Sequence, residues 1–207
     1  MKEKIATRII IQGIIQVVSA LSYYFLLKNL AVEYIGIQGT VATAINLFSA
    51  IYFIGIDVVY LQYNNENDFK DYFSNYMIIK LFLLLLNFVP LVFYVIFFGS
   101  PDNVYFFIMI IATIFLRIAD TFCLNLRANL KIIKGEIIEF ISTLMLSITR
   151  LIIALFASRF TNPLLILGLT TLFFYLLKLI SSFLISKPDL SFTKPQKERI
   201  FTLLKAT

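Results

Sequence analysis

The sequence predicts an all-α integral membrane protein with six transmembrane helices and both termini in the cytoplasm. Hydrophobic residues make up 60% of the 207 residues and charged residues 14%, against about half and about a quarter in soluble proteins. Six runs reach the roughly 20 apolar residues that a spanning helix needs. The runs are residues 9–27, 39–61, 77–98, 104–126, 137–157 and 163–186.

Turn-forming residues separate these runs. Gly36 precedes the second run, residues 99–103 (Gly-Ser-Pro-Asp-Asn) precede the fourth, and Gly135 precedes the fifth. Asn162 and Pro163 open the sixth. Glycine, proline and asparagine favour turns and helix starts, so the connections are short and the six helices form one bundle over residues 1–186.

The placement of lysine and arginine predicts the orientation of the bundle. Cytoplasmic loops of membrane proteins carry an excess of these residues. With a cytoplasmic N-terminus, only Lys28 and Arg159 fall in outside loops. The inside carries Lys2, Lys4, Arg8, Lys70, Arg127, Lys131, Lys134, Lys187, Lys194, Lys197, Arg199 and Lys205.

The tail, residues 187–207, differs from the rest of the chain. Within residues 196–206, apolar and charged side chains alternate in a way that is typical of a short amphipathic helix on a membrane surface. We therefore expect residues 187–207 to form a cytoplasmic amphipathic linker or tail.

Several function classes are disfavoured by residues that the sequence lacks. It has no histidine and a single cysteine, Cys123, so it has no histidine-based acid–base pair, no histidine metal site and no intrachain disulfide. No nucleic-acid-binding motif is present, and the basic residues suit anionic lipid headgroups instead. We expect no enzyme activity, no cofactor, no metal site and no nucleic-acid partner.

One face of the first predicted helix is polar. A polar stripe on a spanning helix is expected to avoid lipid, and two interpretations remain open. The stripe lines a hydrated cavity, or it hydrogen-bonds to neighbouring helices while its first residue anchors the helix at the interface. Its members recur at spacings of three or four and are Arg8, Gln12, Gln16, Ser19 and Tyr23.

Charged residues also lie inside the apolar runs. Arg117 and Asp120 are three residues apart in the fourth run and can pair within the helix. Arg150 lies in the fifth run and Lys178 in the sixth. Since a charge near the bilayer centre costs about 2.5–3.5 kcal/mol on insertion scales, intramembrane charges are functional candidates.

Two explanations of these charges remain open. In one, they only pair across helices, for instance Arg150 with Asp120 or Lys178 with Glu139. In the other, the basic excess attracts an anionic substrate such as a phosphate, which a guanidinium group can bind bidentately. Lys80 lies near the inner end of its helix, where it can extend toward the headgroups, and a structural role is favoured for it.

Several stretches resemble polysaccharide and O-antigen flippases of the multidrug/oligosaccharidyl-lipid/polysaccharide exporter superfamily. They are Val32-Glu33-Tyr34-Ile35-Gly36 after the first helix, Gly55-Ile56-Asp57 at the end of the second, and Leu126-Arg127-Ala128-Asn129 between the fourth and fifth. Arg150 falls where a basic residue is common in the family's fifth helix, and residues 187–192 resemble its linker toward a seventh.

The resemblance implies that the chain is the N-terminal lobe of a two-lobe exporter in the plasma membrane. The cargo would be a polyprenyl-diphosphate-linked glycan, and a second six-helix lobe or partner chain would complete the cavity. Arg8, Arg117, Arg150 and Lys178, with Asp120 beside them, would receive the diphosphate. Gln12, Gln16, Ser19 and Tyr23 would bind sugar hydroxyls. The alternatives are a multidrug-type exporter of the same superfamily and a non-transporting six-helix subunit.

Overall fold

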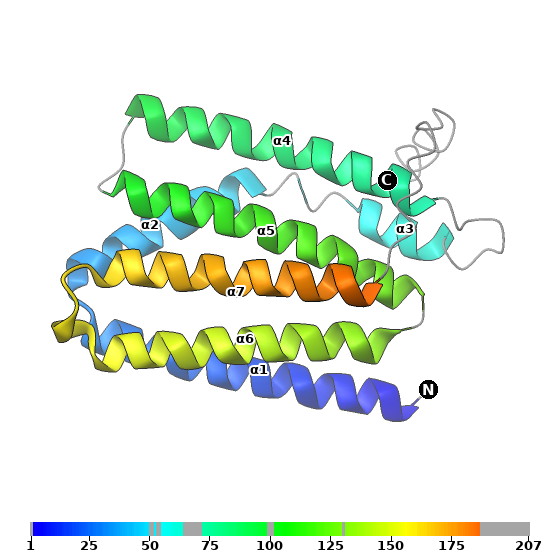
Figure 1. Ribbon diagram of the computed structural model, residues 1–207, viewed down its shortest axis with the longest axis horizontal. Helices are drawn as coiled ribbons and strands as arrows, with labels where there is room; N and C mark the ends of the chain where they lie inside the picture. The colour runs from blue at the N-terminus through cyan, green and yellow to red at the C-terminus, as the bar shows by residue number, and fades with distance from the viewer. Residues whose placement is uncertain are drawn as a thin grey trace.

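A computed structural model describes residues 2–49, 52, 55–63, 72–98, 102–129 and 131–186. Throughout these residues the regular structure is helical (Figure 1). The predicted tail, residues 187–207, lies outside the described part. The helices are α1 (Lys2–Asn29), α2 (Val32–Ser49), α3 (Ile56–Tyr63), α4 (Tyr72–Phe98), α5 (Asn103–Ala128), α6 (Ile132–Leu155), η2 (Ala157–Arg159) and α7 (Pro163–Ser186).

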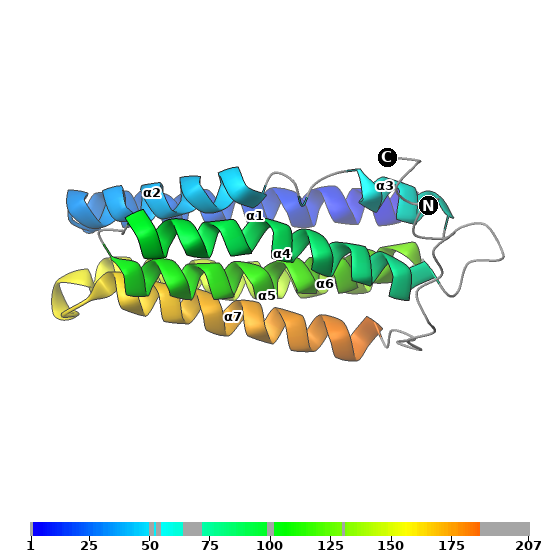
Figure 2. The same ribbon diagram turned by 90° about the horizontal axis from the view of Figure 1, so that it is seen from above.

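The long helices run side by side along one axis, and successive helices reverse direction (Figures 1 and 2). α1 begins and α7 ends at the same end of the bundle, which we call the N-terminal end. The start of α4 and the end of α5 also lie there, with α3 beside them. The most extensive packing joins α5 to α7, α1 to α6, and α6 to α7.

Five of the described helices are long and apolar enough to cross a membrane, which is typical of a multipass membrane protein. They are Ile9–Asn29, Phe73–Phe97, Asn103–Ala128, Ile132–Leu155 and Pro163–Ser186. Each coincides with a run predicted from the sequence. The remaining predicted span, residues 39–61, does not meet the same criterion.

The prediction of one continuous helix over residues 39–61 is wrong. α2 starts earlier, at Val32, and ends at Ser49, and α3 begins only at Ile56. Between them, the main chain at Tyr52 is tied to another helix, because its carbonyl oxygen accepts a hydrogen bond from Lys80 of α4 (3.0 Å). Side-chain donors can satisfy backbone groups outside a helix, so the carbonyl of Tyr52, which lies in neither α2 nor α3, has a partner.

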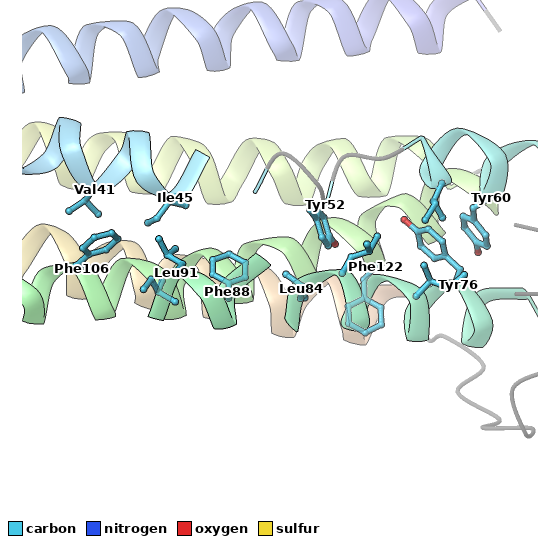
Figure 3. Close-up of a cluster of buried hydrophobic side chains, with 14 of the residues drawn as sticks. Val41, Ile45, Tyr52, Tyr60, Tyr76, Leu84, Phe88, Leu91, Phe106 and Phe122 are labelled. Carbon is cyan, nitrogen blue, oxygen red and sulfur yellow. The ribbon is translucent and has the colours of Figure 1, made fainter. Parts of the chain in front are cut away.

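The hydrophobic core joins α2 and α3 to α4 and α5. In Figure 3, Val41 and Ile45 of α2 lie over Phe106 and Leu91, which come from the layer formed by α4 and α5. All four are buried. The core continues to the N-terminal end of the bundle, where the Tyr60 and Tyr76 rings stack with centroids 4.3 Å apart.

Gly168 lies at a close contact between α7 and α5. A Cβ atom added there would lie 3.1 Å from side-chain atoms of both Ile108 and Tyr105 on α5. Small residues let membrane helices approach closely. The packing of α5 against α7 therefore depends on the missing side chain.

Candidate binding pocket at the helix break

A polar pocket of about 210 Å³ lies between α3, α4, α5 and α6, beside the break between α2 and α3. Asp120 lies about 12 Å before the end of α5, at a rise of about 1.5 Å per residue, so the pocket is in the half of the bundle nearer the N-terminal end. Its lining is Tyr52, Asp57, Tyr76, Arg117, Asp120, Thr121, Cys123, Leu124, Arg127 and Glu139.

Tyr52 connects the helix break to the pocket wall on α5. Its hydroxyl donates to the carbonyl oxygen of Arg117 (3.0 Å) and lies 2.9 Å from the hydroxyl of Thr121. The guanidinium carbon of Arg117 lies 5.7 Å from the centre of the Tyr52 ring, within the range of a cation–π contact. Tyr52 thus fixes the break against α5.

Lys80 holds the same break from the α4 side. Its side chain is only 1% exposed, and its ammonium nitrogen lies 2.5 Å from a carboxylate oxygen of Asp57 at the start of α3. The ammonium also lies 4.1 Å from the centre of the Tyr52 ring, and the Tyr76 hydroxyl donates to Asp57 (2.7 Å). Lys80 does not extend toward the headgroups, because a carboxylate, a carbonyl and an aromatic ring receive its charge inside the protein. These contacts agree with the structural role that the sequence favours for it.

Asp120 forms ion pairs with basic groups on two helices. The Lys178 ammonium of α7 donates to its Oδ1 (2.7 Å), and the Arg117 guanidinium lies 3.8 Å from its Oδ2. The expected intrahelical pairing of Arg117 and Asp120 is therefore present as a loose contact, and the shorter bond runs between helices. Lys178 reaches the pocket through this carboxylate.

A second charged cluster joins α1, α5 and α6 at the N-terminal end of the bundle. Arg127 of α5 lies 2.8 Å from Glu139 and 3.2 Å from Glu136, both on α6. Glu136 is buried and accepts a hydrogen bond from Gln12 of α1 (3.0 Å).

Acidic and basic groups are present in equal number around the pocket, but they are not equally exposed. The Asp57 and Asp120 side chains are each 39% exposed, whereas their basic neighbours Lys80 and Lys178 are 1% and 6% exposed. Glu139 is likewise slightly more exposed than Arg127. The groups compared are Lys80, Arg117, Arg127 and Lys178 against Asp57, Asp120, Glu136 and Glu139. Carboxylate oxygens therefore face the pocket, with ammonium groups behind them.

Of the predicted deep charges, Arg117, Asp120 and Lys178 come together, while Arg150 lies elsewhere. Arg150 is near the end of α6, away from the N-terminal end, and it forms no ion pair with any residue that the structure describes. The predicted pairs Arg150–Asp120 and Lys178–Glu139 are wrong: Asp120 pairs with Lys178, and Glu139 pairs with Arg127. Because α5 and α6 run in opposite directions, the end of α6 that carries Arg150 lies beside the start of α5. Asp120 lies in the last third of α5, too far along the bundle to meet Arg150.

Two residues on the polar face of α1 contact α6, and none of the described side chains on this face lines the pocket. Gln12 bonds to Glu136, and the Ser19 and Ser147 hydroxyls lie 3.4 Å apart. Gln16 and Tyr23 are exposed on the bundle surface. The side chain of Arg8 lies outside the described part. The contacts of Gln12 and Ser19 match the alternative in which this face attaches α1 to a neighbouring helix.

Sequence reasoning missed Tyr52, Glu136 and the inward role of Arg127. Arg127 was assigned to a cytoplasmic turn, although its spacing from the next helix start leaves it able to fold back onto α6. Glu136 lies one helical turn before Glu139, and two carboxylates that follow Arg127 closely in the sequence indicate an ion pair with it. Tyr52 lies among apolar residues, so nothing in the sequence around it indicates its contacts.

No family model matches the chain, and no curated protein or solved structure shows significant similarity to it.

Proposed function

We propose that the chain forms one lobe of a multipass membrane transporter for a lipid-linked glycan, a polyprenyl-diphosphate-linked oligosaccharide, at the plasma membrane. The observation that carries the proposal is the charged pocket at the break between α2 and α3. Irregular backbone at membrane depth is tolerated where it is buried in protein or lines a water-filled cavity, and interrupted helices are typical of transporter binding sites.

Exposed polar side chains on α1 and α2 support a partner for this lobe. Gln16, Thr40, Thr43 and Asn46 are all exposed on the bundle surface. Hydrogen-bonding side chains facing lipid are unfavourable, whereas the same groups stabilise helix–helix association. A second six-helix lobe or a partner chain against this surface would bring hydrogen-bonding groups to these side chains.

The test measures glycan export in the host organism. Deleting the chain should make the lipid-linked glycan accumulate on the cytoplasmic leaflet, and the wild-type chain should restore export. Arg117→Gln, at the pocket, should lower export about tenfold or more, while the matched Arg150→Gln, outside the pocket, should stay near wild type. Normal export in the deletion strain would refute the function, and equal effects of the two arginine variants would remove the pocket from it.

The ion pairs favour a second candidate, a non-transporting membrane subunit. Asp57, Asp120 and Glu139 each have a basic partner within 4 Å, which is what a purely structural network would show. Exchanging the charges, with Asp120→Lys and Lys178→Asp together, separates the candidates. Full recovery of protein abundance and of every measurable phenotype by the exchanged pair would favour the structural role.

A further inference from the structure

We infer that the pocket beside the helix break binds a neutral, hydroxyl-rich group, one glycosyl unit of the cargo, and that the diphosphate lies outside this pocket. The inference deepens the proposed function and rests on it for the identity of the cargo. It departs from the expectation that the deep basic residues receive the diphosphate.

The first step is the charge balance. Equal numbers of basic and acidic groups surround the pocket, so the site offers no net positive potential. Phosphate recognition depends on such a potential, for instance from ammonium groups that have no acidic partner. Here the Lys80 and Lys178 ammonium groups are directed into carboxylates at 2.5 and 2.7 Å.

The second step is the identity of the atoms that a ligand would meet. Asp57 and Asp120 are more exposed than the bases behind them, and ionised carboxylates only accept hydrogen bonds. Phosphate oxygens are acceptors as well, so they would be repelled. A sugar hydroxyl donates one hydrogen bond and accepts others, so it can bond to a carboxylate and to a guanidinium group at once.

The third step concerns donors for the sugar oxygens. Arg117 and Arg127 both line the pocket, with side chains 14% and 26% exposed. A guanidinium group carries five N–H donors in a fixed plane, so both arginines bring hydrogen-bond donors to the pocket wall. The pocket wall therefore alternates acceptors and donors, which matches vicinal hydroxyl groups.

A metal ion fits the pocket less well. Within the described residues, no group of three or more His, Cys, Asp or Glu side chains could hold a metal. The charges of Asp57 and Asp120 are already offset by lysines at 2.5 and 2.7 Å.

Size limits the ligand to a small group. The volume of about 210 Å³ is below the roughly 300–1,000 Å³ of pockets for drug-sized ligands. The pocket therefore suits one sugar ring.

The test measures binding to the purified 207-residue chain in lipid nanodiscs, which avoids sugar-based detergents. The probes are methyl glycosides of hexoses, N-acetylhexosamines and 6-deoxyhexoses, followed by ligand-observed NMR, with inorganic pyrophosphate as competitor. At least one glycoside should bind saturably, and pyrophosphate should not displace it. Asp120→Asn should weaken binding about tenfold, as expected for a lost hydrogen bond to a charged group.

Two further variants keep the test decisive. Glu139→Gln should weaken binding as well, and it serves if Asp120→Asn does not fold. Glu33→Gln, an exposed carboxylate on α2 outside the pocket, is the matched control and should bind like wild type. Absence of saturable binding by every glycoside would overturn the inference, and so would displacement of the glycoside by pyrophosphate.

The failures of the two proposals are distinguishable. Glycoside binding together with normal export in the deletion strain would leave the sugar pocket standing and remove the transport function. Lost export in the deletion strain without glycoside binding would support the transport function and remove the sugar pocket.

Discussion

Lys178 of α7 donates a 2.7 Å hydrogen bond to Asp120 of α5, and the other oxygen of that carboxylate lies 3.8 Å from Arg117. This contact crosses the most extensive helix interface in the bundle, between α5 and α7. Because the ammonium is buried and the carboxylate is partly exposed, the two partners respond differently to substitution.

Lys178→Met should cost less stability than Asp120→Ala. Methionine fills the space of the lysine stem and leaves Asp120 with pocket water and Arg117, whereas Asp120→Ala leaves a buried ammonium without its carboxylate. Asp120→Ala should approach the cost of about 3–5 kcal/mol for breaking a buried pair. Lys178→Met should cost only about 1 kcal/mol, because Asp120 is partly exposed. Thermal unfolding of the purified protein measures both, with Lys28→Met, an exposed lysine, as control. The opposite order would contradict the assigned burial.

Gly168→Val should separate α5 from α7. The added side chain would meet Ile108 and Tyr105 from 3.1 Å onward, and overpacking of this kind costs about 1–3 kcal/mol. Gly39→Val is the matched control, since nothing lies within 4 Å of a Cβ atom there. Expression level and thermal unfolding report the difference. Equal stability of the two variants would show that α5 and α7 do not pack as described.

Cys123 offers a direct probe of the pocket, because it is the only cysteine in the sequence and it is buried in the pocket wall. Wild-type protein should react slowly with a small maleimide. Tyr52→Ala removes the side chain that fixes the helix break to α5, so labelling should accelerate about tenfold or more, given how completely the thiol is shielded. Tyr24→Ala, at an exposed tyrosine of α1, should label like wild type. Unchanged labelling of Tyr52→Ala would contradict the role given to Tyr52.

The orientation of the bundle can be tested in a Cys123→Ser background. Asn103→Cys and Arg159→Cys lie at the end opposite the N-terminal end, and Lys131→Cys lies at the N-terminal end; all three positions are exposed. With a cytoplasmic N-terminus, a membrane-impermeant thiol reagent should label the first two in intact cells. It should reach Lys131→Cys only after permeabilisation. The reverse pattern would overturn the predicted topology.

The sequence alone was sufficient to predict the helical class and the approximate positions of α1, α4, α5, α6 and α7. Spanning helices are recognised from runs of apolar residues, because hydrogen bonds within the helix satisfy the backbone in lipid. Local periodicity also placed Arg117 and Asp120 on one face of α5, where they lie in contact. These features depend only on residues close together in the chain.

Only the tertiary structure decided which charges meet and what the pocket presents to a ligand. Helix periodicity cannot say which neighbour a face opposes, so the pairing of Lys178 with Asp120, the burial of Lys80 and the separation of Arg150 required the packed bundle. The break between α2 and α3 also depends on Lys80 and Thr121, which are remote in sequence from Tyr52. Packing places the lysines behind the carboxylates, and that order of burial makes oxygen acceptors the exposed atoms of the site.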